Sequence, residues 1–177
     1  SAQGAGTAFQ NAGLGGAIRW DGRDNHYFPT SGLYAQAVGT WYSSAWGSDH
    51  TFGYLKTDLR GYRPVGPGVL AGQVFTAGIA GRAPFTILPS LGGDDLMRGY
   101  HSGRFRDRVL WSTQAEYRMP LVWRFKGTAF ASAGEVASHV GPTLFENVEM
   151  AAWLGLRFRL TDSGLHGRLD VGYSRTE

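Results

Sequence analysis

The side chains that could perform acid–base or metal chemistry are scattered along this chain of 177 residues. The histidines show none of the paired spacings that metal sites use: they are His26, His50, His101, His139 and His166. The sequence holds no GxSxG nucleophile elbow and no Walker-type phosphate loop. Ser112, His166 and Asp170 have the residue types of a hydrolytic triad, but nothing in their spacing brings them together. The sequence therefore predicts no enzyme, no metal and no other cofactor.

Ionisable residues are instead arranged by alternation, most clearly in the stretch Leu91–Leu121. A glycine-punctuated, charge-rich loop leads there into a strand whose polar residues occupy every second position: Ser112, Gln114, Glu116 and Arg118. Side chains alternate across a strand, so one face carries charge and the other is apolar and aromatic. This pattern is typical of a barrel with lipid outside and a hydrated, polar interior.

Composition agrees with strands rather than helices crossing a membrane. The chain has 27 glycines, 14% aromatic residues and only 18% charged residues, below the usual share of about 25%. No run of about 18 apolar residues is present, which excludes a transmembrane helix. Cysteine is absent, which excludes disulfides and thiolate metal sites. The formal net charge is +3, but Lys and Arg are dispersed rather than clustered, so we expect no nucleic-acid partner.

The hydrophobic pattern predicts eight strands, near residues 14–21, 32–43, 50–62, 68–80, 108–119, 123–135, 148–160 and 165–175. Each is about as long as a tilted strand that crosses a bilayer, roughly 9–11 residues. Connections rich in Gly, Pro, Asp and Asn alternate with generally longer ones, as in outer-membrane barrels. We therefore expect an all-β fold, an antiparallel transmembrane β-barrel of about eight strands forming one domain over residues 1–177. The first residues have no signal-peptide pattern, which favours a mature chain or an excised domain.

The strands near 50–62, 123–135, 148–160 and 165–175 show the same sidedness, whereas alternation does not assign the faces of those near 32–43 and 68–80. Lys56, Asp58 and Arg60 alternate with apolar residues and Thr57, and Arg157 and Asp170 also fall on polar faces. Burying so many charges in a dry core would cost too much free energy, which argues against a soluble ligand-binding barrel. Aromatic residues near strand ends lie where an interfacial girdle is expected: Trp20, Trp41, Tyr62, Tyr117, Trp123, Phe158 and Tyr173. Packing of a sandwich core is the alternative explanation for these aromatics.

The motif Arg98-Gly99-Tyr100 in the long loop, followed by a strand and then by the segment 130–134 (FASAG), resembles a known family. It is similar to the C-terminal half of the barrel in the BamA/TamA/FhaC-like outer-membrane assembly and secretion superfamily, the bacterial surface antigen family. The stretch 20–32, with WDGRD, FP and Gly32, resembles a recurrent strand–turn–strand unit of the same barrels.

The resemblance implies roles for particular residues. Arg98 matches an arginine on a loop that folds into the barrel and pairs with acidic side chains of the inner wall. Glu116 matches the acidic residue of the next strand, so a charge-assisted bond between the two is implied. Ser132 stands where the family commonly has an inward aspartate. We call Arg98, Gly99, Tyr100, Glu116 and Ser132 the loop lock. Without the resemblance, Arg98 would be an ordinary solvated loop residue, and Glu116 would pair with Arg118 or another arginine of the lumen.

The resemblance implies a protein of the bacterial outer membrane that contacts the lipid bilayer and supports insertion or translocation of unfolded outer-membrane polypeptides. Barrels of the family usually have sixteen strands, so eight predicted strands leave three arrangements open. These are a small closed barrel, a half-barrel that forms a homodimer, and a part of a larger barrel. A closed barrel of eight strands has an interior just filled by side chains. The family's periplasmic receiving domains are not expected within residues 1–177. The alternative function is a structural membrane anchor without transport activity.

Overall fold

The computed structural model describes residues 10–93, 96–97, 103, 105–121, 125–141, 144–159 and 166–174. Within these residues the chain is almost entirely β-structure, with two short 3-10 turns at Ser44–Trp46 and Phe85–Ile87. The strands are β1 (Gly13–Asp21), β2 (Gly32–Tyr42), β3 (Phe52–Val65), β4 (Gly68–Gly81), β5 (Ser90–Leu91), β6 (Phe105–Arg106), β7 (Val109–Pro120), β8 (Phe125–Ala137), β9 (Glu149–Arg159) and β10 (His166–Ser174).

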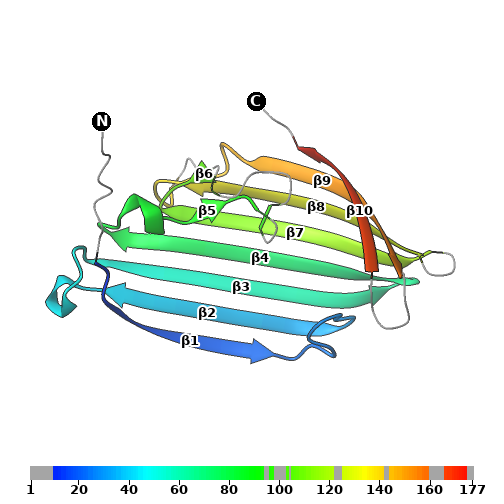
Figure 1. The fold of residues 1–177 in the computed structure, drawn as a ribbon, viewed down its shortest axis with the longest axis horizontal. Coiled ribbons are helices and arrows are strands. Elements are labelled where there is room, and N and C mark those ends of the chain that lie inside the picture. Colours follow the sequence, from blue (N-terminus) through cyan, green and yellow to red (C-terminus); the bar gives the residue numbers. More distant parts are fainter. Residues whose placement is uncertain are drawn as a thin grey trace, which may run out of the picture.

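Eight of these strands form one antiparallel sheet in the order β1-β2-β3-β4-β7-β8-β9-β10 (Figure 1). Each strand pairs with its neighbour in the chain, except that β4 pairs with β7 across the long loop. The eight predicted strands are confirmed, with bounds that differ by at most a few residues. The small β5–β6 ribbon inside the loop was not predicted, because two-residue strands leave no periodic pattern in a sequence.

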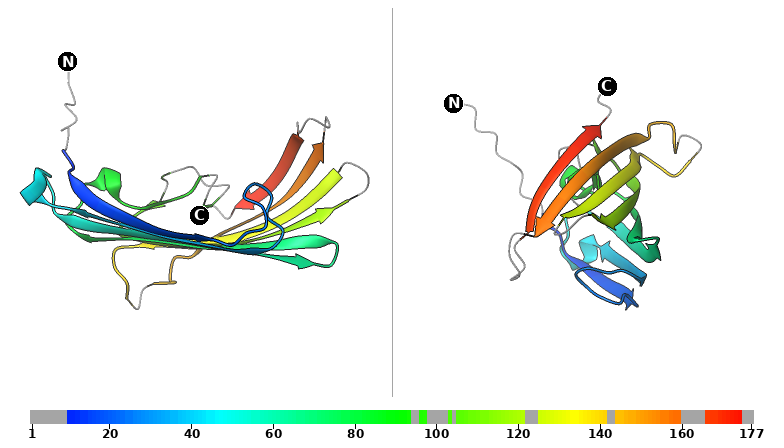
Figure 2. Two further views of the ribbon diagram at one scale, coloured as in Figure 1. Left: turned by 90° about the horizontal axis from the view of Figure 1, so that it is seen from below. Right: turned by 90° about the vertical axis from the view of Figure 1, so that its right-hand side faces the viewer.

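The sheet is curved but open. β1 and β10 lie at its two edges, and neither pairs with a second strand among the described residues (Figure 2). The β5–β6 ribbon lies over the concave side. A closed barrel of eight strands has its interior filled by its own side chains, so it would have no room for this ribbon. The small closed barrel considered from the sequence is therefore not what this chain forms.

The two faces of the sheet differ in chemistry as the alternation predicted. Strand register places on the convex face a set of large apolar side chains that are 45–80% exposed: Leu14, Ile18, Trp20, Leu33, Trp41, Leu55, Leu59, Leu70, Val74, Met150, Leu154 and Val171. Water would make so broad an apolar surface unfavourable, whereas lipid would not. The side chains of Trp123, Phe158 and Tyr173 lie outside the described part of the chain. Of the other predicted girdle residues, one is misplaced. Tyr62 lies on the concave face, with the Arg118 guanidinium 5.9 Å from its ring centre.

Three of the four largest fully buried side chains in the described residues mark the contact between the long loop and the concave face. Leu91 and Met97 from the loop pack with Leu110 of β7, and all three are at most 1% exposed. Ala77 and Ala151 complete this cluster. The principal packed core therefore holds the loop on the sheet. In the described part of the chain, no helix is long and apolar enough to cross a membrane.

Candidate functional site: the concave wall

Glu116 on β7 forms an ion pair with Arg118 of the same strand. The Arg118 Nε donates a hydrogen bond of 2.7 Å to the Glu116 Oε1, and the Glu116 side chain is 12% exposed. Register places both residues on the concave face, opposite Thr128 and Phe130 of β8. Arg118 is thus one partner of Glu116, as the local-pairing alternative proposed. Arg98, Gly99 and Tyr100 lie outside the described residues, so their part of the loop lock remains a prediction.

A second polar network crosses three strands of the same face. Arg60 donates two hydrogen bonds of 3.1 Å and one of 2.6 Å to the Asp58 carboxylate. Asp58 also accepts a 2.8 Å hydrogen bond from the Gln73 amide, and Gln114 donates to the Gln73 side-chain oxygen. Charges that are partly removed from water are tolerated when they are paired and hydrogen-bonded in this way. The sequence predicted that Asp58, Arg60 and Gln114 face inward. Strand register places Gln73 of β4 between them, so that its side chain links β3 to β7.

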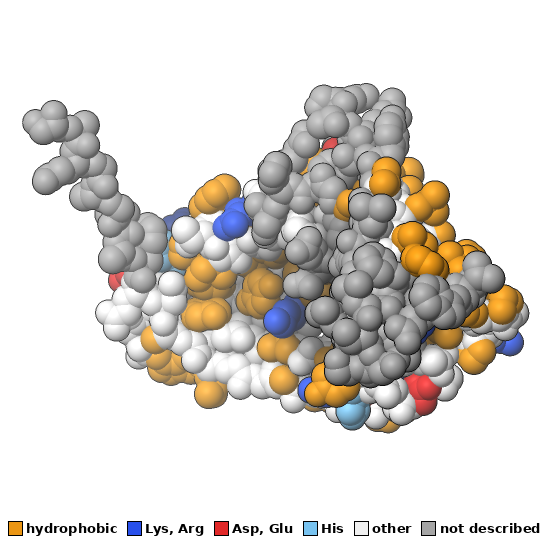
Figure 3. Space-filling model, turned by 45° about the vertical axis from the view of Figure 1, so that its right-hand side comes forward, with side chains coloured by type: hydrophobic (Ala, Val, Ile, Leu, Met, Phe, Trp, Pro, Cys, Tyr) orange, Lys and Arg blue, Asp and Glu red, His pale blue; other side chains and the backbone are white. Residues whose placement is uncertain are grey.

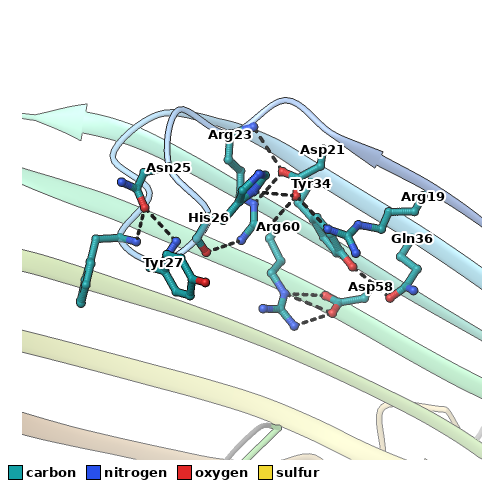
Figure 4. A network of polar contacts seen from close by, with 11 residues as sticks. Arg19, Asp21, Arg23, Asn25, His26, Tyr27, Tyr34, Gln36, Asp58 and Arg60 are labelled. Atoms are coloured by element: carbon teal, nitrogen blue, oxygen red, sulfur yellow. Dashed lines mark hydrogen bonds and ion pairs between the residues drawn. The ribbon is translucent and has the colours of Figure 1, made fainter.

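Asp21 anchors the turn between β1 and β2 to this wall (Figure 4). Its carboxylate accepts hydrogen bonds from Arg23, with a shortest distance of 2.8 Å, and from Arg19 at 3.3 Å. The His26 Nδ1 lies 3.2 Å from the same carboxylate. The hydrogen bond to Asp21 raises the pKa of Arg23 above its usual value, so this guanidinium stays charged.

Three guanidinium groups surround the ring of Tyr34 on β2. The ring centre lies 4.8 Å from Arg23 and 5.5 Å from both Arg19 and Arg60. Cation–π contacts of this kind hold a cation over an aromatic face. The Tyr34 hydroxyl donates to the Gln36 side-chain oxygen at 3.0 Å. This cluster was missed from the sequence, because its members come from separate segments and meet only through strand register.

Ser132 lies on the concave face as predicted, paired in register with Gln114. It is 6% exposed, and its hydroxyl has no hydrogen-bond partner in the described part of the chain. The indole nitrogen of Trp153, on the adjacent β9, is also buried and also has no hydrogen-bond partner among the described residues. Buried polar atoms usually have partners, so both mark a place on the wall where a polar group fits.

The described flank of the Arg98 loop reaches this wall. The Ser112 hydroxyl donates a 3.0 Å hydrogen bond to the Leu96 carbonyl, and Met97 is fully buried beside Leu110. Residues directly before Arg98 are therefore fixed over β7, on the face that carries Glu116.

The residues considered for metal or triad chemistry come from separate parts of the chain. Among the described residues, no group of three or more His, Asp or Glu side chains could hold a metal ion. Ser112 lies on β7 and the backbones of His166 and Asp170 lie on β10, with β8 and β9 between them. At the usual spacing of strands this is roughly 14 Å along the sheet.

These features define a class of protein. The concave wall is lined by ion pairs and carries a folded-in loop, whereas the convex wall exposes apolar side chains. Lys and Arg side chains appear singly rather than as one block in the oblique view of Figure 3. An antiparallel sheet with these two faces is the wall of a transmembrane β-barrel with a polar interior.

The chain belongs to the Omp85 superfamily, since the Omp85 superfamily domain matches residues 2–173. It is thus a protein of the bacterial outer membrane, from a family of insertion and translocation factors, and the soluble ligand-binding barrel is wrong. The fold resembles the crystal structure of BamA from Haemophilus ducreyi lacking POTRA domains 1-3, with a TM-score of 0.75 and 19% sequence identity. The match covers 92% of this chain and 38% of that one, so the chain spans well under half of the BamA chain. No curated protein matches the chain at a significant level.

Proposed function

We propose that residues 1–177 act as one barrel unit, the loop-bearing part of an outer-membrane wall that inserts or translocates polypeptides. The observation that carries this proposal is the outer edge of β10. In the described residues β10 pairs only with β9, within a sheet whose convex face is apolar. A strand edge in lipid needs a partner, because the bilayer offers no water to its backbone groups.

The partner we propose is a strand of an unfolded outer-membrane polypeptide. An incoming segment would add to the free edge through main-chain hydrogen bonds, which depend little on its sequence. The sheet would then continue into lipid with its apolar side chains outward. A seam at an edge strand can open and close more easily than one between central strands, since only one ladder of hydrogen bonds must exchange.

Photocrosslinking at two matched positions tests this mechanism. Val171 of β10 and Leu154 of β9 are paired in register and are 71% and 69% exposed on the convex face. A photoreactive residue at Val171 should capture unfolded outer-membrane polypeptides during their assembly, several-fold more often than one at Leu154. Equal capture at both positions would overturn the proposal. Capture of only a second copy would instead identify a homodimer, and capture of neither would leave a structural anchor.

We also propose that Arg98 contacts Glu116 and Ser132 on the concave wall, completing the loop lock. The support is the placement of its neighbours: Leu96 is held by Ser112, four residues before Glu116 on the same face. The Ser132 hydroxyl, which has no partner among the described residues, could accept from a guanidinium and so replace part of the expected aspartate.

A double-mutant cycle tests the lock. Arg98→Ala and Glu116→Gln should be coupled by about 1 kcal/mol or more in thermal unfolding of the detergent-solubilised protein, because contacting residues are not additive. Arg98→Ala with Asp58→Asn serves as the control and should be additive, since Asp58 is engaged with Arg60 and Gln73. Additivity within roughly 0.5 kcal/mol for the first pair would exclude a direct contact.

A further inference from the structure

A buried carboxylate sits on the face of the sheet that is otherwise apolar. Glu135 of β8 pairs in register with Trp111, on the convex side, yet it is only 2% exposed. The connection between β8 and β9 covers it. The Glu135 Oε2 accepts a 2.7 Å hydrogen bond from the Phe145 amide, and the Oε1 accepts one of 3.1 Å from the Asn147 amide. Figure 2 shows this connection on the convex side of the sheet, opposite the β5–β6 ribbon.

We call the two hydrogen bonds to Glu135 the clasp. Further contacts beside the clasp hold the connection in place. The Phe145 ring packs on Trp111, with 5.1 Å between ring centres. Phe145 has a φ of 84°, in the left-handed region that non-glycine residues rarely adopt. Such a conformation persists when surrounding contacts hold it, and here these are the Glu135 hydrogen bonds and the tilted contact of the Phe145 ring with Trp111.

A groove of about 940 Å³ runs between this connection and the sheet. Gly16, Gly39 and Gly78 form its floor on three strands, Trp41 and Trp111 stand in its walls, and Leu144 lines it from the connection. A Cβ added at Gly16 or Gly78 would meet no atom within 4 Å, so the floor is open. The volume falls within the roughly 300–1,000 Å³ that small-molecule sites occupy.

We propose that this groove holds one acyl chain of an anionic membrane lipid. The groove is continuous with the apolar convex wall that faces the bilayer, so a lipid chain is the neighbour already at hand. Trp111 lines the groove, and its buried indole N–H has no partner in the described part of the chain, which leaves a donor for an ester carbonyl. A purely apolar occupant would leave this buried donor without a hydrogen bond.

Two arginines lie in the chain close to residues at one end of the groove. Arg108 directly precedes Val109, which lines the groove, and Arg82 follows Ala80, which also lines it. The Arg108 guanidinium donates to the Gly81 carbonyl, so it lies at the end of β4, where Arg82 is the next residue in the chain. A phosphate between them would gain charge-assisted hydrogen bonds.

Selectivity must come from shape and polar contacts. In a bilayer the surroundings are as apolar as the groove, so the hydrophobic effect gives no preference for this place over the rest of the wall. The glycine floor, the Trp111 donor and the two arginines are what distinguish the groove from ordinary wall. We therefore expect a several-fold preference rather than absolute specificity.

A photoreactive lipid tests the site. The protein isolated from the outer membrane is placed in phosphatidylethanolamine vesicles containing a phosphatidylglycerol with a diazirine on one acyl chain. Peptides that contain Trp111 and Leu144 should be labelled several-fold above the rest of the convex wall. Gly78→Leu or Gly39→Leu should fill the groove and reduce this labelling to the level of the wall. Gly72→Leu is the matched control, because Gly72 lies on the same face of β4 outside the groove.

Several results would overturn the proposal. Uniform labelling of the wall would mean ordinary boundary lipid, and unchanged labelling in both groove-filling variants would place the lipid elsewhere. A membrane-embedded protein segment crosslinked in the groove in place of lipid would identify a different occupant. Equal labelling by a phosphatidylcholine analogue with the same chain would refute the role of Arg82 and Arg108.

Discussion

Replacing Glu135 should release the connection between β8 and β9 from the convex face. This carboxylate is almost completely buried and accepts the Phe145 and Asn147 amides. Alanine would remove both acceptors and leave two N–H groups without partners. Glutamine keeps one acceptor oxygen and the shape of the side chain, but it loses the charge and places an N–H₂ group beside a donor.

The size of the effect follows from these two bonds. A hydrogen bond to a charged group contributes about 1.5–3 kcal/mol, so two bonds place an upper bound of roughly 3–6 kcal/mol on the clasp. Release to solvent restores hydration to both amides, so we expect about 3 kcal/mol for Glu135→Ala and about 2 kcal/mol for Glu135→Gln. At about 1.4 kcal/mol per factor of ten, these values correspond to roughly hundredfold and thirtyfold faster opening of the connection.

Hydrogen exchange at single amides measures this directly. The Phe145 and Asn147 amides should lose protection by these factors in detergent micelles, while amides of the central strands keep theirs. Glu146→Gln is the control, because Glu146 lies exposed on the same connection and carries the same charge. Unchanged exchange at both amides in Glu135→Ala would refute the clasp.

Three further substitutions test the fold and the turns. Met97→Ala should destabilise the protein by about 2–4 kcal/mol in thermal unfolding, since Met97 is fully buried where the loop meets the sheet. Gly32→Ala should cost roughly 1–3 kcal/mol or more in the same measurement, because φ is +103° and the new Cβ would lie 2.2 Å from a backbone oxygen. Hydrogen bonds from the Thr30 hydroxyl and from neighbouring amides lower the pKa of Asp24 from 3.8 to about 2. The Asp24 carboxylate should therefore stabilise the β1–β2 turn above pH 3.8. That stabilisation should be lost as the pH falls through about 2. Hydrogen exchange of the turn amides should then become faster than the intrinsic pH dependence of exchange predicts.

Matched variants separate these effects from general damage. Met150→Ala should change thermal unfolding little, since Met150 is 62% exposed on the convex face. Gly16→Ala should be tolerated, because its added Cβ meets no neighbour within 4 Å. Asp24→Asn should abolish the acid dependence of the turn. Equal destabilisation by the two methionine variants, or by the two glycine variants, would contradict the reasoning from burial and from backbone conformation.

Alternation along single strands was enough to predict much of the architecture. A strand forces neighbouring side chains to opposite faces, so the pattern of Ser112, Gln114, Glu116 and Arg118 determined which face of β7 is polar. The same local rule gave the eight strands and the membrane-facing side. The Arg98 motif, by its resemblance, pointed to the family that the domain match then showed.

Contacts between distant segments were decided only by the tertiary structure. Strand register brought three arginines to one Tyr34 ring, and no local pattern encodes register. Glu135 falls on the apolar face by alternation. Only the fold of the following connection over that face shows how its charge is satisfied. The sequence by itself thus determined the sidedness of the strands that alternate clearly, because that depends on neighbouring residues of one strand. The open edges, the loop on the concave wall and the covered groove depend on which strands and loops meet, and only the tertiary structure decided them.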